Sequence, residues 1–174
     1  LMEPPEDGEP MNDQQLRNEV LTMLLAGHET VASLVIWALY QLSLHPETQR
    51  RLQAELETVL SGRTPDMSDL SSLAYTRRVL LETLRLFPPA WAIGRVPQEA
   101  DEIGGAAIPR GRVVYMSPYV THRHPEFWPR PHVYDPDRWE SDPLSGKHNL
   151  AFFPFGGGRR KCIGDRVAML EATI

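Results

Sequence analysis

One long helical pattern of apolar residues near the start of the chain limits the possible folds most strongly. Asn12 followed by Gln15 forms a capping-box start, and apolar residues then recur at helical spacing. This spacing predicts a helix over residues 13–44, about 48 Å long at the standard rise of about 1.5 Å per residue. From Val20 onward the apolar residues spread over most of the circumference, which is typical of a helix buried on every side.

The rest of the chain offers too little apolar surface to cover such a helix, so we expect a larger parent protein, truncated here at both ends. Leu1 is not a methionine, and Ile174 lies inside a helical pattern without a glycine or proline stop. Residues 1–11 are rich in proline and acidic residues, a composition typical of a flexible linker. A membrane span is the weaker alternative for the long helix, because His28 and Glu29 interrupt the apolar run before it reaches about 18 residues.

The composition is that of an ordinary soluble domain. The chain has 174 residues and a net charge of -5, with 41% hydrophobic and 24% charged residues. We expect no nucleic-acid partner, since a nucleic-acid-binding face should be basic and rich in aromatic residues. The single cysteine forms no internal disulfide, which permits a reducing compartment. No signal peptide or membrane segment is predicted, which favours the cytoplasm and leaves an anchor upstream of this chain as an open alternative.

The stretch around the cysteine combines glycines, cations and a thiol. Its sequence is FGGGRRKCIG over residues 155–164, and Cys162 is the only cysteine. Glycines let a flat ligand approach the backbone closely. The helical pattern after Gly164 places Cys162 just before a helix N-terminus, where N–H groups and the helix dipole favour an anion. We therefore expect this thiol to ionise readily, and a thiolate is a nucleophile or a soft metal ligand.

Other interpretations of this stretch are weaker. A lone cysteine is most often a small buried hydrophobe, but an apolar site would not contain so many glycines and cations. Gly156 to Lys161 lacks the length and the Ser or Thr of a phosphate loop, and a lysine stands where a dinucleotide fingerprint needs its third glycine. Zinc would need further Cys or His at short spacing. His122-x-His124 is such a pair, but we expect both to be surface residues of a proline-rich loop.

The pattern Phe155-x-x-Gly158-x-Arg160-x-Cys162-x-Gly164 resembles the haem-binding loop of cytochromes P450, and every fixed position of that signature is filled. The resemblance implies that these five residues bind haem b, iron protoporphyrin IX, with the cysteine thiolate as the proximal iron ligand. It also implies that the arginine meets a haem propionate, since a guanidinium pairs with a carboxylate in two-pronged fashion. The chain would then be the C-terminal part of the P450 fold.

Within the predicted long helix, Ala26-Gly27-His28-Glu29-Thr30 places a glycine and three polar residues in a buried setting. Glycine in a helix costs about 1 kcal/mol against alanine. One interpretation is local: His28 and Glu29 reach solvent, and Thr30 bonds back to the Ala26 carbonyl. The segment also resembles the oxygen-binding segment of the P450 family. That resemblance implies that Ala26 and Gly27 leave room for dioxygen, while Glu29 and Thr30 pass protons to it as catalytic residues.

Two further helices are predicted over residues 46–60 and 72–86. In the second of them, Glu82 and Arg85 lie three residues apart and can pair. Most such pairs are solvated and contribute about 0 to 1 kcal/mol. Glu-x-x-Arg here resembles the K-helix motif of the P450 family, whose third member is Arg138. The implied role is structural, a buried network that places the cysteine loop.

The segment after these helices predicts a small antiparallel sheet, with short strands over 91–96, 106–108 and 112–116. Residues 117–151 are interpreted as an ordered, proline-rich meander. The fold class is therefore mainly α with a small antiparallel β-sheet. By the same resemblance Arg95 is a second propionate-binding arginine. The resemblance also places three residues in the substrate pocket: Ala90, Trp91 and Ala92.

For the intact protein, the resemblance implies a haem-thiolate monooxygenase that inserts one atom of dioxygen into an apolar small molecule. Its electrons would originate in NAD(P)H and arrive from a ferredoxin, a flavodoxin or a flavoprotein reductase. Arg159 and Lys161 would dock that partner, or they form a solvated basic face. A haem-thiolate isomerase, dehydratase or peroxygenase is an alternative, against which Glu29-Thr30 argues. A non-catalytic fragment is another, and we expect the isolated segment to be inactive.

Overall fold

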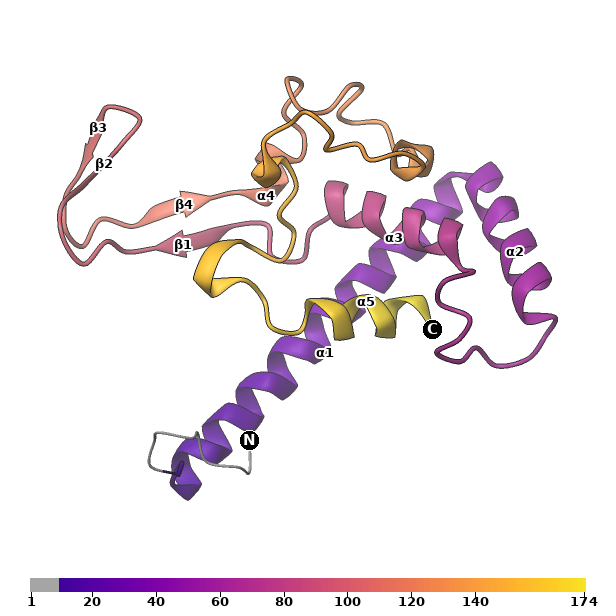
Figure 1. Cartoon of the computed structure of the whole chain (residues 1–174), viewed down its shortest axis with the longest axis horizontal. Coiled ribbons are helices and arrows are strands. Elements are labelled where there is room, and N and C mark those ends of the chain that lie inside the picture. Colours follow the sequence, from indigo (N-terminus) through magenta and orange to yellow (C-terminus); the bar gives the residue numbers. More distant parts are fainter. Residues whose placement is uncertain (1–9) are drawn as a thin grey trace.

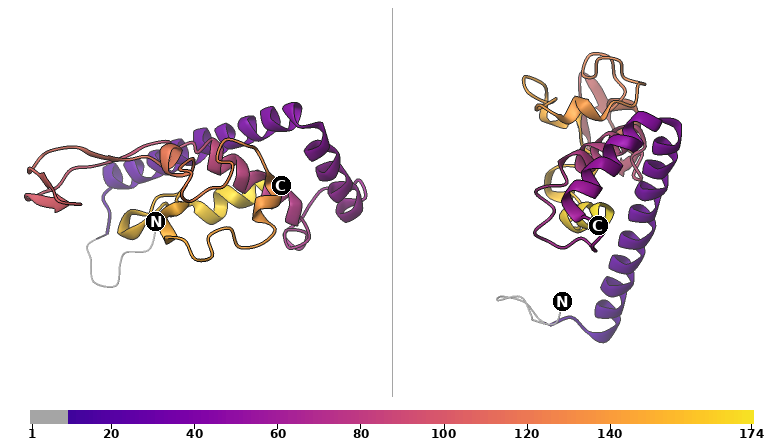
Figure 2. Two further views of the ribbon diagram at one scale, coloured as in Figure 1. Left: turned by 90° about the horizontal axis from the view of Figure 1, so that it is seen from above. Right: turned by 90° about the vertical axis from the view of Figure 1, so that its right-hand side faces the viewer.

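The structure, a computed structural model, describes residues 10–174, so most of the linker predicted over residues 1–11 lies outside the described residues. A single long helix, α1 (Asp13–Leu44), runs along one edge of the molecule, and the other elements gather on one side of it (Figures 1 and 2). At its start, Oδ1 of Asn12 accepts from the Gln15 amide at 2.9 Å, and Oε1 of Gln15 accepts from the Asn12 amide at 3.0 Å. The predicted helix and capping box are confirmed.

Three more helices pack with α1: α2 (Pro46–Leu60), α3 (Ala74–Leu86) and α5 (Asp165–Thr173). Of these, α3 contacts all the others and so forms the centre of the chain. The core cluster between α1 and α3 consists of Leu34, Ala38, Leu80 and Leu84, with Phe152, Phe155, Met169 and Ala172 packed against it. Residues of α3, α1, the cysteine loop and α5 thus share one apolar cluster.

The N-terminus of α3 is capped by a side chain from α2. The Glu55 carboxylate accepts from the backbone amides of Tyr75 and Thr76 at 2.6 Å and 2.8 Å, and from the Thr76 hydroxyl at 2.8 Å. These amides have no partner inside their own helix. The helix begins at Ala74 rather than at the predicted residue 72, because the Ser72 amide closes a turn on the Asp69 carbonyl.

Most of α1 is not covered by the described part of the chain. Its buried residues all lie in the C-terminal half, namely Leu34, Ala38, Gln41 and Leu42. Large apolar side chains remain exposed, among them Leu24, Leu25, Ile36 and Leu39. The predicted burial on every side is therefore not provided by residues 10–174. By length and composition alone this helix could also cross a membrane, so its interruption at His28 and Glu29 does not exclude a span.

The strands form two separate antiparallel pairs. β1 (Ile93–Arg95) pairs with β4 (Val114–Met116), and β2 (Asp101–Ile103) pairs with β3 (Ala106–Ile108). The β2–β3 hairpin projects from the far end of the β1–β4 ribbon (Figure 1). The chain is thus mainly helical with a little antiparallel sheet, as predicted. The prediction that the strands form one sheet was wrong, because they form two separate pairs.

The sequence interpretation missed β2 because it begins with Asp101 and Glu102, residue types that are depleted in strands. The hairpin forms nevertheless because the two residues that follow β2, Gly104 and Gly105, have φ of 58° and 81°. Two successive residues with positive φ give the turn that matches the twist of a two-stranded hairpin.

Residues 117–151 consist of short helical turns joined by irregular backbone, as their prolines predict. The turns are α4 (Pro118–Thr121), η1 (Pro136–Trp139) and η2 (Asn149–Ala151). Of these, η1 packs against α3. The segment lies over α3 and leads into the loop that carries the cysteine (Figure 1).

Candidate functional site

The loop before α5 holds its cysteine with two backbone hydrogen bonds. The Gly156 amide donates to the Phe153 carbonyl at 2.9 Å, and the Cys162 amide donates to the Phe155 carbonyl at 2.9 Å. Gly156 and Gly158 have φ of 73° and 66°, in the left-handed region that glycine adopts without strain. The glycines therefore allow the chain to fold back on itself and bring Cys162 beside Phe155.

A cavity of about 330 Å³ lies beside this loop, between α1, the end of α3 and β1. Its wall is mostly apolar. The polar side chains that line it are few, namely those of Thr30, Arg95, Arg160 and Cys162. Neither arginine has a carboxylate partner within residues 10–174. A thiol and two uncompensated cations thus border one apolar space.

The predicted oxygen-binding segment is only partly at this cavity. Ala26 and Thr30, one helical turn apart on α1, line it. The Thr30 hydroxyl donates to the Ala26 carbonyl at 2.7 Å, so the predicted local bond is confirmed. Gly27 and Glu29 are exposed and lie outside the cavity lining in the described part of the chain. His28 is exposed as well.

Of the three residues predicted for the substrate pocket, Ala90 lines the cavity, whereas Trp91 and Ala92 do not belong to the lining that the described residues form. Trp91 is 65% exposed. Its carbonyl accepts from the Ser117 hydroxyl at 2.8 Å, which fixes the backbone against the start of α4. The Trp91 side chain is therefore mostly in contact with solvent in the described part of the chain and not part of the cavity wall.

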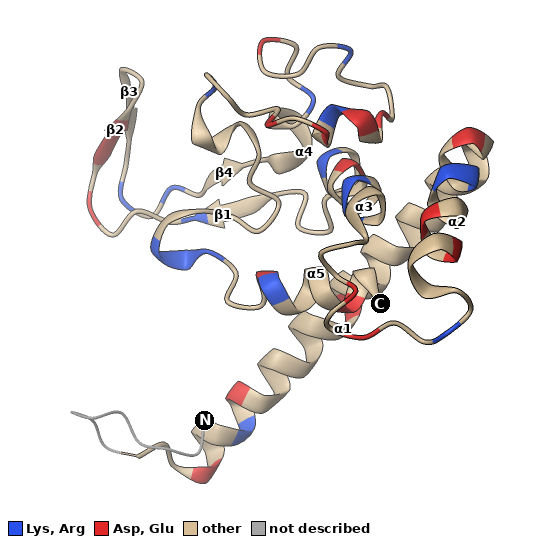
Figure 3. Cartoon of the chain, turned by 45° about the vertical axis from the view of Figure 1, so that its right-hand side comes forward, with Lys and Arg blue, Asp and Glu red and all other residues tan. Residues whose placement is uncertain are grey.

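A basic turn, Gly158–Arg160, precedes the cysteine in the chain, and a basic turn is seen beside β1 (Figure 3). Arg159 and Lys161 are both exposed. Nζ of Lys161 lies 2.6 Å from Oδ2 of Asp165, and this hydrogen bond lowers the pKa of that carboxyl group. The lysine charge is therefore partly compensated, and that of Arg159 is not paired within the described residues.

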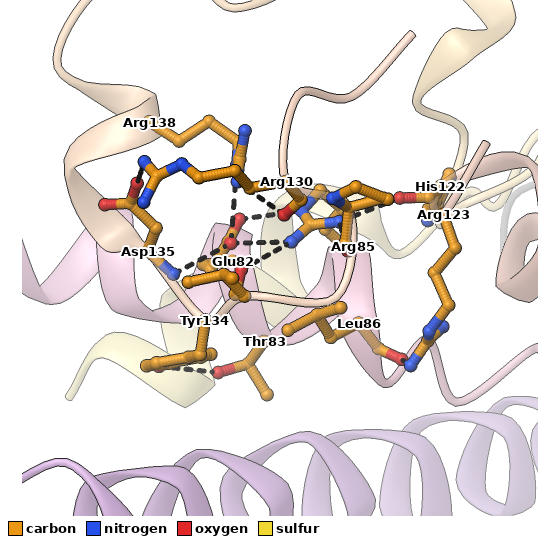
Figure 4. Close-up of polar contacts among 12 residues, drawn as sticks. Glu82, Thr83, Arg85, Leu86, His122, Arg123, Arg130, Tyr134, Asp135 and Arg138 are labelled. Atoms are coloured by element: carbon orange, nitrogen blue, oxygen red, sulfur yellow. Dashed lines mark hydrogen bonds and ion pairs between the residues drawn. The ribbon is translucent and has the colours of Figure 1, made fainter. Parts of the chain in front are cut away.

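The residues predicted as a structural network meet around the carboxylate of Glu82 (Figure 4). Arg85 donates to both carboxylate oxygens, from Nε at 2.9 Å and from Nη2 at 2.7 Å. Nε of Arg138 lies 3.4 Å from Oε1. The carboxylate also accepts from the Trp139 indole at 2.9 Å and from the Asp135 amide at 3.0 Å. Since Glu82 and Arg85 are fully buried, all of these bonds form away from water.

The remaining donors of Arg85 hold the backbone of the meander. Nη1 donates to the carbonyls of His122 and Pro131 at 2.9 Å and 2.7 Å, and Nη2 donates to that of Val133 at 3.1 Å. Sequence reasoning missed these contacts because backbone carbonyls leave no signal in the sequence. One guanidinium therefore joins α3 to three points of the segment that precedes the cysteine loop.

Similarity to a known protein family identifies the family to which this chain belongs. A sequence model of the family described as cytochrome P450 matches residues 1–174. The chain is a member of the cytochrome P450 family. Cyclooctatin synthase of Streptomyces melanosporofaciens is 47% identical over 97% of this chain and 37% of its own length. Pentalenene oxygenase of Streptomyces avermitilis is 41% identical over 97% of this chain and 38% of its own length.

A third relative and a solved structure agree with this membership. Cyclooctat-9-en-7-ol 5-monooxygenase of Streptomyces melanosporofaciens is 41% identical over 99% of this chain and 38% of its own length. The crystal structure of the cytochrome P450DA heme domain matches with a TM-score of 0.89 and 36% identity, over 97% of this chain and 38% of that one. The chain thus spans less than two fifths of the P450 proteins that it matches.

The residues at the cavity fit the haem that the P450 family implies. A thiolate is a ligand for haem iron, and the Cys162 sulfur borders the cavity. The two arginines without carboxylate partners suit the acidic edge of a porphyrin. A Cβ on Gly156 would lie 3.5 Å from Cδ1 of Ile93, so the loop backbone lies close to β1 at this edge of the cavity.

The structure contradicts one prediction for the P450 meander, because His122 is not a surface residue. It is 0% exposed, and its Nε2 accepts from the Phe153 amide at 2.9 Å. Burial lowers the pKa of this imidazole to about 3, so the ring is neutral. His124 is half exposed, as predicted. A proline-rich sequence could not show that one of the two rings is covered by α3 and Phe152.

Proposed function

We propose that the full-length protein is a haem-thiolate monooxygenase and that Cys162 binds its haem b iron as the thiolate ligand. The main support is that Cys162 lines the same apolar cavity as Ala26 and Thr30 of α1. Cys162, the proposed iron ligand, and Ala26 and Thr30, the proposed oxygen-side residues, thus line one cavity. When bound, the haem supplies the redox chemistry with dioxygen, and the protein supplies the thiolate, orientation and protons.

On the haem side, Arg95 and Arg160 line the cavity and would hold the propionates through charge-assisted hydrogen bonds. Phe155 and Gly158 shape the loop around the ligand. Gly164 lies beside the sulfur, since a Cβ built on it would be in ordinary van der Waals contact with Sγ of Cys162, at 3.9 Å. The α5 helix begins directly after Gly164, and its amide end stabilises the negative thiolate.

On the oxygen side, Thr30 holds a hydroxyl at the cavity wall, where it would donate or relay a proton into the cavity. Ala26, which lines the cavity, and Gly27 next to it leave room for dioxygen because both side chains are small. Glu29 is exposed beside this wall and exchanges protons with solvent. The threonine and the glutamate thus connect the cavity to water.

The substrate is an apolar small molecule with few polar groups. The cavity wall above the cysteine is made of hydrocarbon side chains, among them Val31, Leu84, Ala90 and Ile93. Two relatives carry the names pentalenene oxygenase and cyclooctat-9-en-7-ol 5-monooxygenase, which supports a mainly hydrocarbon substrate for this protein too.

Electrons arrive from an acidic ferredoxin, flavodoxin or flavoprotein reductase that docks at Arg159. This arginine is exposed next to the cysteine loop, whereas Lys161 already pairs with Asp165. Arg159→Glu should slow reduction of the haem, with an effect that shrinks at high salt. Reduction at an unchanged rate at all salt concentrations would leave these residues as a solvated basic face.

The isolated segment is inactive, and the full-length protein functions in the cytoplasm. The support for inactivity is the exposed apolar surface of α1, represented by Leu24, Leu25 and Leu39. Further chain, of the kind that makes up most of the length of the relatives, would cover it.

Isotopically labelled dioxygen tests the reaction. The haem-loaded full-length protein, supplied with a reductase and pentalenene or another hydrocarbon probe, should release product that carries one labelled oxygen atom. The other atom should appear in water. Product without label would contradict a monooxygenase and favour the isomerase or dehydratase alternative. Turnover driven only by peroxide would favour the peroxygenase.

A further inference from the structure

The buried Glu82–Arg85 pair is connected to the cysteine loop through one histidine. Nη1 of Arg85 donates to the His122 carbonyl at 2.9 Å. The ring of the same residue accepts from the Phe153 amide through Nε2, also at 2.9 Å. His122 therefore joins α3 to Phe153, the first residue of the cysteine loop, by which we mean residues 153–164.

From Phe153 the hydrogen bonds continue to the cysteine. The Phe153 carbonyl accepts from the Gly156 amide at 2.9 Å, which closes the first turn of the loop. The Phe155 carbonyl then accepts from the Cys162 amide at 2.9 Å. A displacement of Phe153 would consequently move both turns that determine where the sulfur lies.

The environment of the ring shows what the histidine contributes. A backbone amide can only donate, so Nε2 must be unprotonated and the ring proton lies on Nδ1. Nδ1 is buried and makes no hydrogen bond of good geometry among the described residues, although the backbone of Arg85 and Leu84 lies near the ring. A buried donor that is poorly paired costs free energy. A phenyl ring could pack equally well against Phe152, whose centroid lies 4.9 Å away, without this cost. What only the imidazole adds is an acceptor for Phe153.

We propose that His122 is a positioning residue for Cys162, which as a neutral acceptor fixes the start of the cysteine loop to the buried Glu82–Arg85 pair. Its role is to set the place of the sulfur beside the cavity. The inference rests on the proposed function, because it concerns the thiolate that binds haem iron.

Three variants of the haem-loaded full-length protein test this role. His122→Phe keeps a flat ring and removes the acceptor. His122→Gln replaces the ring but places an amide oxygen near the position of Nε2. His124→Phe is the matched control, since that ring is half exposed and its contacts of this kind within residues 10–174 are with Glu126, two residues further along the chain.

The readouts are the spectrum of the reduced carbon monoxide complex and the haem reduction potential. We expect His122→Phe to lose part of the thiolate-type band in favour of the thiol-type band and to shift the potential upward. His122→Gln should recover most of both, and His124→Phe should match the wild type. The proposal is overturned if His122→Phe matches the wild type in band and potential, or if His122→Gln recovers neither.

Amide exchange in the wild type provides a test that does not depend on any variant folding. The Phe153 amide should be protected, and in His122→Phe it should exchange about fivefold to tenfold faster, as expected for the loss of one net hydrogen bond. Unprotected exchange in the wild type would overturn the proposal. If the wild type instead shows no thiolate-type band, the proposed function fails, while the exchange measurement still decides whether His122 holds Phe153.

Discussion

The Glu82 carboxylate receives two hydrogen bonds from the Arg85 guanidinium, at 2.9 Å and 2.7 Å, and neither side chain is exposed to solvent. A buried ion pair contributes little to net stability, but removing one partner leaves the other charge without compensation. The effect of this pair on the free energy of unfolding should therefore be measurable when one of its two partners is removed.

Glu82→Gln should lower the free energy of unfolding of the full-length protein by about 3 to 5 kcal/mol. Denaturant titration measures this change. Glu47→Gln is the control, because Glu47 pairs with Arg50 on the surface and is 69% exposed. It should change stability by less than about 0.5 kcal/mol. Equal small effects of both substitutions would show that the buried pair does not organise this region.

Glu55→Ala should destabilise the protein by about 1 to 2 kcal/mol, the effect of losing a helix cap. The reason is that Glu55 accepts from the first amides of α3. Glu57→Ala, an exposed position on the same helix, is the control and should be close to neutral. Equal melting temperatures for the two variants would argue against a cap supplied by α2.

His122 should make stability depend on pH between about 6.5 and 3. Burial lowers the pKa of the folded imidazole to about 3 from 6.5, and the charges of Arg85 and Arg123 further disfavour its protonation. As the pH falls below 6.5, the unfolded chain takes up a proton that the folded chain does not. The folded state should therefore lose up to about 1.4 kcal/mol per pH unit.

Denaturant titrations at several acidic pH values measure this dependence as the difference between the wild type and His122→Gln. The variant should have the shallower slope, because glutamine binds no proton in this range. Parallel curves for the wild type and His122→Gln would contradict a neutral, buried imidazole.

Thr30→Ala should reduce product formed per pair of electrons by about tenfold or more, with substrate affinity nearly unchanged, because the cavity loses the hydroxyl that we propose as its proton donor. Thr22→Ala is a matched control on α1. The Thr22 hydroxyl makes the same bond to the carbonyl one turn earlier, at 2.8 Å, on an exposed face. If both variants kept full coupling, Thr30 would have only the local role.

Local sequence signals predicted much of this fold and part of the site. The Asn12–Gln15 capping box and helical spacing gave the bounds of α1, because both depend on neighbouring residues. The β2 strand was missed since its pairing overrides the poor strand propensity of Asp101. The burial of His122 was missed because it depends on α3, which is distant in sequence. Long-range contacts of this kind decide burial and leave no local pattern.

Long-range contacts also explain why the sequence could not show which of the predicted pocket residues line the cavity. Ala90 and Trp91 are neighbours in one short segment, and the resemblance placed both at the substrate pocket. Only contacts made elsewhere determine which of them faces the cavity. The Ser117 hydroxyl holds the Trp91 carbonyl, and the Trp91 side chain is mostly exposed.

The most direct test of the central claim, a thiolate of Cys162 on haem iron, is the absorption spectrum of the reduced carbon monoxide complex of the full-length protein. We predict a thiolate-type spectrum for the wild type and its complete loss in Cys162→Ala. A histidine-type spectrum in the wild type, or a thiolate-type spectrum that persists in Cys162→Ala, would contradict the account.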